Sequence, residues 1–307
     1  MSALIDTVTG AWQIRAMPAT LIDQAHAEAY RNDGYLLLPD VFDDAALQPV
    51  RAAIDAEVDR LADRFHREGK VGSRHEDEPF NRRLVLLCEE AGEQVKIWEL
   101  RTRAAVTPVL YDFVRHPALL DLMTALLGRE VAWTGSFAVR LKLPETGETA
   151  FPWHQDTQYY GNPTRHLHVI SVWIPLVDVD ERNGCMHLLA GSHRWGLLGG
   201  ARDDQRVVRM FEDVEQRAKP VVLPMRRGDL LAFSNLTCHA SMMNTTNEMR
   251  WSVDLRYIVP EAAAARSEDE RRGYATIYDH YRMRPITVAS RDPDQVVPWE
   301  QIRNLVS

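Results

Sequence analysis

Cysteine is scarce in this chain, and its spacing excludes the usual structural roles of that residue. Only three cysteines occur among 307 residues, and no two of them form a CxxC pair. An odd number without such spacing argues against a disulfide framework and fits a reducing compartment. We therefore expect a cytoplasmic protein.

Long apolar runs and an excess of positive charge are lacking as well. No window approaches the ~18 apolar residues that a membrane span requires. Residues 1–20 contain neither a basic leader nor a continuous apolar segment, so no signal peptide is expected. The formal net charge of −8 disfavours a duplex nucleic-acid partner. The expected partner is a small molecule, with neither membrane nor nucleic acid, and the sequence leaves the oligomeric state open.

The hydrophobic pattern changes its period near residue 130. Before that point, apolar residues recur mainly every three to four positions, which is typical of amphipathic helices. From 130 to 260 the period is two, which indicates strands. Helices are expected at 21–32, 43–65 and, as a pair, 106–127, with a strand at 35–38 and a charged loop at 67–83. Further strands are expected at 131–143, 149–154, 167–176, 186–189, 219–223, 229–233, 238–243 and 250–259.

About eight strands joined by turns fit a double-sheet jelly roll. We predict a mainly β fold with flanking helices, in which a helical N-terminal part supports the β core. No repeat, low-complexity tract or linker divides the chain, so one domain over 1–307 is expected. Its parts would be helical support (20–128), the core (130–260, with a charged insertion at 196–217) and a C-terminal extension (261–307).

Three residues have the side-chain types and spacing expected of a metal site. His154 and Asp156 follow an apolar strand, and positions two apart on an extended chain project to the same face. His239 opens another expected strand and can supply a third ligand. Two histidines and one carboxylate form the facial triad that holds non-haem Fe(II) and leaves half of its coordination sphere open. Zn²⁺ accepts the same ligands, so a zinc-dependent hydrolase is the chemical alternative.

An arginine eleven residues after His239 favours iron over zinc. Arg250 provides a planar fork for a carboxylate, which suggests that a small ketoacid occupies the open face of the metal. We therefore predict a dioxygenase that depends on Fe(II) and 2-oxoglutarate. A jelly-roll protein that binds ligands without turnover is a third hypothesis.

Other histidines also lie close to acids or to each other. His75-Glu76-Asp77 repeats the His-x-Asp pattern, but it lacks apolar neighbours and is interpreted as a solvated loop. His166 and His168 share a strand face without an adjacent carboxylate, and we interpret them as a pair at a strand entry.

Five segments, in the order WHQD, GCMHLLAGSHRWG, GDLLAF, CHASMMN and RWSVDLRY, closely resemble the phytanoyl-CoA dioxygenase family, which includes ectoine hydroxylase. The resemblance spans about residues 130–258 and continues more weakly upstream from GYLLLPDVF. It implies a double-stranded β-helix, a cupin-like jelly roll, that binds Fe(II) and uses 2-oxoglutarate and O₂ as co-substrates. It also implies hydroxylation of a small molecule with release of succinate and CO₂.

The resemblance assigns roles to individual residues. His154, Asp156 and His239 match the iron ligands, and Arg250 matches the arginine that binds the distal carboxylate of 2-oxoglutarate. Retention of Asp156 favours hydroxylation over halogenation, whereas desaturation, epoxidation and ring closure need the same ligands.

Four further residues are assigned to the co-substrate. Ser252 shares the strand face of Arg250 and can donate to the same carboxylate, Trp173 matches a tryptophan that lines the pocket, and Lys96 matches an upstream lysine. The chain departs from the family at Ser136 and Ala138, where longer side chains are common. Arg140 shares their face, and we expect it to replace such a contact, to bind an acidic substrate, or to be a surface residue.

The segment after the first two ligands is expected to contact the substrate. It begins with Thr157 and carries Tyr159 and Tyr160, of which one is expected to face the substrate and one to pack. The loop 67–83 and the insertion 197–217 are candidates for a lid that excludes water.

Overall fold

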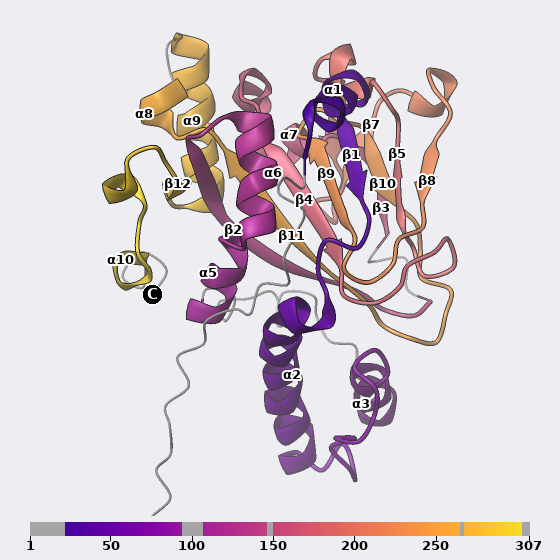
Figure 1. Ribbon diagram of the computed structural model, residues 1–307. Coiled ribbons are helices and arrows are strands. Elements are labelled where there is room, and N and C mark those ends of the chain that lie inside the picture. The colour runs from indigo at the N-terminus through magenta and orange to yellow at the C-terminus, as the bar shows by residue number, and fades with distance from the viewer. Residues whose placement is uncertain (1–21, 94–106, 146–149, 265–266, 303–307) are drawn as a thin grey trace, which may run out of the picture.

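The computed structural model describes residues 22–93, 107–145, 150–264 and 267–302 (Figure 1). Two antiparallel sheets form its core. The larger sheet has the order β1 (Tyr35–Leu38), β9 (Leu230–Ser234), β4 (Ile170–Pro175), β11 (Arg250–Ile258), β2 (Val131–Lys142) and β12 (Ile286–Ala289). The smaller sheet has the order β3 (Phe151–His154), β10 (His239–Ser241), β5 (Met186–Leu188) and β8 (Val221–Leu223).

Strand β11 shows why the larger sheet is buried on both faces. All nine of its residues are buried, although apolar and polar residues alternate along it. Trp251, Val253, Leu255 and Tyr257 belong to the main hydrophobic cluster on one face. The intervening residues are polar and project to the opposite face, because successive side chains of a strand alternate. This opposite face carries the candidate site.

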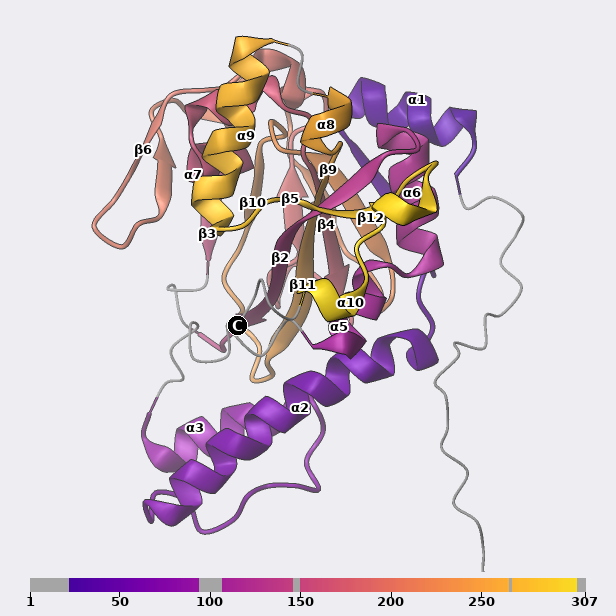
Figure 2. The same cartoon turned by 90° about the vertical axis from the view of Figure 1, so that its left-hand side faces the viewer.

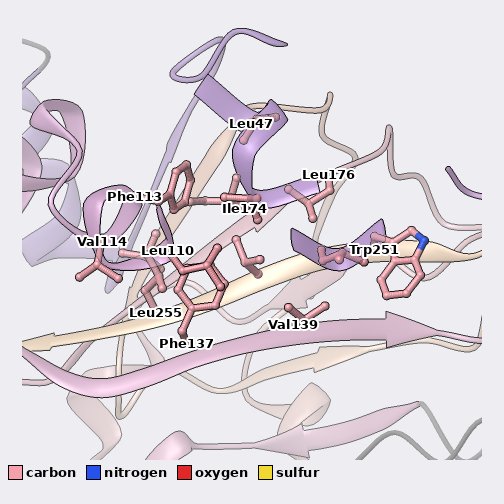
Figure 3. Packing of buried hydrophobic residues seen from close by; sticks show 14 of the residues in the cluster. Leu47, Leu110, Phe113, Val114, Phe137, Val139, Ile174, Leu176, Trp251 and Leu255 are labelled. Atoms are coloured by element: carbon pink, nitrogen blue, oxygen red, sulfur yellow. The ribbon is translucent and has the colours of Figure 1, made fainter. Parts of the chain in front are cut away.

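Helices cover the apolar face of the larger sheet (Figure 1). Figure 3 shows Leu47, Leu110 and Phe113 from these helices around Ile174 and Leu255 of the sheet. The helices preceding the core are α1 (Gln24–Asp33), α2 (Asp44–Arg67), α3 (Arg83–Ala91), α5 (Pro108–Val114) and α6 (Pro117–Leu127). The apolar face of each packs inward, as expected for amphipathic helices.

The helix boundaries follow local capping chemistry. Asp43 accepts a hydrogen bond from the backbone N–H of Ala46 at the start of α2, at 2.9 Å. Helices α5 and α6 each begin with a proline, whose missing N–H costs nothing at the first helical position. Gly34 ends α1 with a φ of 77°, which glycine adopts without strain.

The remaining elements lie around the core (Figure 2). Strands β6 (Gly200–Arg202) and β7 (Val208–Met210) form a separate hairpin. Helix α9 (Glu268–Tyr281) packs against the 3-10 helix η3 (Asn162–His166) and the strand β2. Shorter pieces are α7 (Asp156–Tyr160), α8 (Glu261–Ala264), α10 (Trp299–Ile302), η4 (Ser192–Trp195), η5 (Val214–Gln216) and η6 (Pro293–Gln295).

The predicted jelly roll and all eight predicted core strands are confirmed, with boundaries shifted by a few residues. The hairpin β6–β7, the helix α3 and the edge strand β12 were not predicted. In particular, β12 shows that residues beyond 261 add a strand to the larger sheet beside β2. Among the described residues, no helix is both long and apolar enough to cross a bilayer.

Candidate metal centre

The three predicted metal ligands come together at one end of the smaller sheet. His154 ends β3 and His239 begins the neighbouring strand β10, where the two residues are paired in register. Asp156 is the first residue of α7, directly after β3. One ligand atom from each residue lies within 4.8 Å of the other two, and all three residues are buried. Within the described ranges, no other group of three or more histidine, cysteine or acidic residues is arranged to hold a metal ion.

Backbone carbonyl groups orient both imidazoles. Nδ1 of His154 lies 2.7 Å from the carbonyl oxygen of Pro152, and Nδ1 of His239 lies 2.9 Å from that of Thr237. A carbonyl oxygen only accepts, so each Nδ1 carries the proton and each Nε2 presents a free lone pair. The ring centroids are 4.1 Å apart. Both rings therefore offer Nε2 to a shared position.

Burial favours the neutral form of these imidazoles. Burial and the neighbouring His239 lower the pKa of His154 to about 3. Burial also lowers the pKa of His239. Because a metal binds the neutral imidazole, both rings have the protonation state of a ligand at neutral pH.

The carboxylate of Asp156 is held through one of its two oxygens. Oδ2 lies 3.1 Å from Nε of Arg256 and accepts a hydrogen bond from the hydroxyl of Ser171. Oδ1 lies 3.8 Å from Nε2 of His239. Burial alone would raise the pKa of Asp156, but Arg256 and the two imidazoles outweigh it and keep the pKa below its usual range. The carboxylate is therefore ionised, with Oδ1 directed to the side of the histidines.

Alternating charges extend from Asp156 along the inner face of the larger sheet. Nε of Arg256 donates to the hydroxyl of Tyr160 at 2.7 Å, and Nη2 of Arg256 lies 3.6 Å from Asp254. Asp254 in turn accepts a hydrogen bond from Nε of Arg140 at 2.7 Å. Sequence reasoning missed Arg256, although it follows Arg250 by six residues and so shares its strand face. The period of two was the signal that could have identified it.

The predicted co-substrate arginine is a buried cation that forms no ion pair with an acidic residue in the described part of the chain. Arg250 is 4% exposed, and its Nη1 donates to the hydroxyl of Ser252 at 2.6 Å. Its guanidinium lies over the ring of Trp173, 5.4 Å from the centroid. Nε of Arg250 has no hydrogen-bond acceptor among the described residues. The structure thus brings Arg250, Ser252 and Trp173 together, as predicted.

The guanidinium of Arg250 stays charged at neutral pH. Burial lowers its pKa to about 10, which is still well above neutrality. A buried cation is costly unless an anion pairs with it. This arrangement therefore fits a carboxylate ligand.

The residues predicted to bind the substrate occupy different environments. Thr157 is fully buried, and its hydroxyl accepts a hydrogen bond from Asn235 at 2.8 Å. Tyr160 is buried against Arg256. The ring of Tyr159 meets that of His154 edge-on, with 5.1 Å between centroids, so Tyr159 is beside the metal ligands. Lys96 lies outside the described residues.

Gln155, between the first two ligands, ties the ligand segments together. Its side-chain amide donates to the carbonyl groups of Leu236 and Gly196, at 2.7 and 2.8 Å. Its Oε1 accepts from the backbone N–H of Leu198 at 2.8 Å. The segments that carry His154 and His239 are therefore held by a side chain that points away from the metal position.

The alternative histidine pattern does not form such a centre. Nε2 of His75 is 2.7 Å from Glu90 of helix α3, at the protein surface. His168 contacts the hydroxyl of Tyr30 at 3.0 Å. The position of His75 agrees with its interpretation as a solvated loop. His166 and His168 do not share a strand face, because His166 ends the 3-10 helix η3 and β4 begins only at Ile170.

The family model of phytanoyl-CoA dioxygenase (PhyH) matches residues 30–252 of the chain. Among curated proteins, the 1-deoxypentalenic acid 11-beta-hydroxylase of Streptomyces arenae is 31% identical over 159 residues, covering 47% of this chain and 55% of the relative. The ectoine dioxygenase of Bordetella parapertussis is 27% identical over 180 residues, covering 57% of this chain and 51% of the relative. A probable phytanoyl-CoA dioxygenase of Caenorhabditis elegans is 25% identical, with 49% and 51% covered. The chain thus spans about half the length of these relatives.

Solved structures share the fold. The apo form of the non-heme monooxygenase ThoJ superposes with a TM-score of 0.57 at 21% identity, covering 89% of this chain and 86% of that one. EctD from S. alaskensis, with 2-oxoglutarate and 5-hydroxyectoine, gives a TM-score of 0.56 at 19% identity, with 80% and 79% covered. These similarities support the predicted jelly roll with flanking helices.

Proposed function

The chain belongs to the phytanoyl-CoA dioxygenase family, and from this premise we propose that it is a non-haem dioxygenase dependent on Fe(II) and 2-oxoglutarate. It would hydroxylate a small molecule and release succinate and CO₂. One observation carries the proposal: the buried group of His154, Asp156 and His239 lies in the same core as Arg250, a buried cation without an acidic partner among the described residues.

The donor set fits ferrous iron. His154 and His239 would each contribute Nε2, and Asp156 would contribute Oδ1, because Oδ2 already contacts Arg256 and Ser171. Two nitrogens and one oxygen on one side of a metal match the facial triad. Bound iron would supply the one-electron chemistry that lets O₂ react with a closed-shell organic molecule while 2-oxoglutarate is oxidised.

The described side chains would position the co-substrate. Arg250 would bind the distal carboxylate through its guanidinium, with Ser252 donating its hydroxyl. The ring of Trp173 fixes the guanidinium from one side and so limits the directions from which a carboxylate can approach. Fixing the far end of a short ketoacid orients its reactive end, which reduces the entropic cost of the reaction.

A zinc-dependent hydrolase is not favoured. The relatives include dioxygenases and a hydroxylase, and a hydrolase would leave the buried Arg250 without a partner. A binding protein without turnover is disfavoured for a similar reason, because the metal ligands and the arginine are all retained.

Substrate and organisation are further parts of the proposal. Tyr159 lies beside His154 and Arg140 is partly exposed, so these two residues are the candidates for substrate contact. Thr157 and Tyr160 would support the site indirectly, through their hydrogen bonds with Asn235 and Arg256. We place the activity in one domain, because the main hydrophobic cluster contains residues of the N-terminal helices, the larger sheet and β12. A cytoplasmic location remains the prediction from cysteine content.

An anaerobic titration tests this function. Purified protein is loaded with Fe(II), and 2-oxoglutarate is added while the visible spectrum is recorded. We expect a metal-to-ligand charge-transfer band that is absent in Asp156→Ala and present in Asp121→Ala, whose aspartate is exposed on α6. A wild-type protein that gives no such band with both components present would contradict the proposal.

A further inference from the structure

A second buried cation lies beside Arg250. Lys142 ends β2 and is paired in register with Arg250 of β11, so the two side chains project from the same face of the larger sheet. Lys142 is 0% exposed and Arg250 is 4% exposed. Lysine is rarely buried to this extent unless it is paired.

Among the described residues, Nζ of Lys142 forms hydrogen bonds only with neutral oxygens. Nζ donates to the hydroxyl of Ser241 at 3.0 Å and to the backbone carbonyl of Met242. In the described part of the chain, neither Lys142 nor Arg250 forms an ion pair with a carboxylate. Ser241 follows the metal ligand His239 by two residues, so Lys142 reaches from the larger sheet to the strand that carries that ligand.

The path of the Lys142 side chain is closely packed. A Cβ atom on Gly184 would lie 2.8 Å from Cδ of Lys142 and 2.4 Å from the carbonyl oxygen of Met242. Gly184 has a φ of +80°, which other residues rarely adopt. The turn at Gly184 thus leaves room for the lysine and little else, so the ammonium group is held in place.

Two adjacent buried cations are unfavourable when no anion accompanies them. Burial, followed by repulsion from Arg250, lowers the pKa of Lys142 to about 6. Two hydrogen bonds to neutral oxygens do not require an amine, because an amide or a hydroxyl can make them. With this pKa the amine is mostly neutral at neutral pH, and a carboxylate bound between it and Arg250 would raise the pKa and restore the positive charge.

We propose that Lys142 is a second cation of the co-substrate site, which binds the distal carboxylate of 2-oxoglutarate together with Arg250. A carboxylate accepts about four hydrogen bonds, so its two oxygens can receive the guanidinium and the ammonium at once. Ser252 is bonded to Arg250 and Ser241 to Lys142, and both hydroxyls would accompany their cations. This inference rests on the proposed function, and it adds a positioning residue whose role differs from that of the metal ligands.

The rival explanation is a structural one, in which Lys142 only links the two sheets through Ser241 and Met242. The two roles differ in what the charge does. A structural link needs hydrogen bonds but no charge, so the Lys142→Gln variant should preserve the link. A carboxylate site needs the charge, so neither the Lys142→Gln variant nor the Lys142→Met variant should bind the carboxylate as the wild type does.

The experiment compares two ketoacids that differ only at the far end. 2-Oxovalerate has a methyl group where 2-oxoglutarate has the distal carboxylate. Binding of each is measured by isothermal titration calorimetry to protein loaded with Mn(II), so that no turnover is needed. The variants are Lys142→Met and Lys142→Gln, and the control is Lys219→Met, which removes an exposed lysine.

We expect both Lys142 variants to weaken 2-oxoglutarate binding about 10- to 100-fold, as for loss of a hydrogen bond to a charged group. Binding of 2-oxovalerate should change less than about threefold. The melting temperature of the variants without co-substrate should equal or exceed that of the wild type, because the variants remove an amine whose protonated form is disfavoured by burial.

Three results would overturn the inference. Equal weakening of both ketoacids with a lower melting temperature would assign Lys142 to a structural link, and so would recovery of 2-oxoglutarate binding in Lys142→Gln. Unchanged 2-oxoglutarate binding in both variants would exclude Lys142 from the site. A wild-type protein that binds neither ketoacid in the presence of metal would instead contradict the proposed function itself.

Discussion

Replacement of Arg256 by methionine tests how the metal ligand Asp156 is held. Arg256 is 6% exposed, its Nε lies 3.1 Å from Asp156, and its Nη2 lies 3.6 Å from Asp254. Methionine fills much of the same volume but leaves both carboxylates without this cation. Removing one partner of a buried ion pair typically costs about 3–5 kcal/mol. For a chain of this size, each kcal/mol lowers the melting temperature by about 2–4 °C, so a loss on the order of 10 °C is expected.

The measurement is thermal unfolding of metal-free protein at neutral pH, followed by the same scan with Mn(II). The metal brings positive charge back to Asp156, so it should restore part of the lost stability in Arg256→Met. Arg272→Met is the control, because its ion pair with Glu268 is exposed and should be worth less than about 1 kcal/mol. A metal-free Arg256→Met protein that melts with the wild type would refute the reasoning.

Two further predictions concern the cations of the proposed co-substrate site. Arg250→Gln should weaken 2-oxoglutarate binding by about 2–5 kcal/mol, or roughly 30-fold and more. Calorimetry measures this, with Arg226→Gln at an exposed site as the control. A change in affinity below about threefold would count against the assignment of Arg250. Lys142, with a pKa of about 6 in place of 10.5, should make stability depend on pH. Between these values the unfolded chain holds a proton that the folded protein lacks, so the folded state gains stability as pH rises. Urea unfolding at roughly pH 7 to 9 should show the wild type gaining on Lys142→Met by up to about 1.4 kcal/mol per pH unit, and a constant difference would show that folding does not lower the pKa of Lys142.

The sequence was sufficient to predict the sheets and the ligand group. The period of two along residues 130–260 located eight strands of the two sheets but not the edge strand β12, which lies beyond that range. His154 and Asp156 were found through their spacing at a strand end, and His239 and Arg250 through their place on later strands. Only the pairing of β3 with β10 in the structure shows that His154 and His239 lie side by side.

Other parts of the site were beyond the reach of sequence patterns. Helix α7 spans only five residues, too few for a helical period to appear, so Asp156 was expected on an extended chain and not at the start of a helix. Arg256 and Lys142 were missed because a charged residue in a strand is ordinarily assigned to solvent, whereas here both strand faces are covered. Hydrogen bonds such as that from Ser171 to Asp156 depend on the register between strands, which one sequence does not reveal.

The amide of Gln155 has a consequence for how this fold can diversify. It is hydrogen-bonded to main-chain atoms of Gly196 and Leu198. It therefore fixes the backbone position of this segment without constraining which side chains the segment carries. The hairpin β6–β7 begins directly afterwards, at Gly200. The exposed tip of the hairpin, residues 204–206, can therefore be exchanged while the proposed metal ligands stay in place. Sequence variation at this tip is thus separated from the residues that would hold the metal.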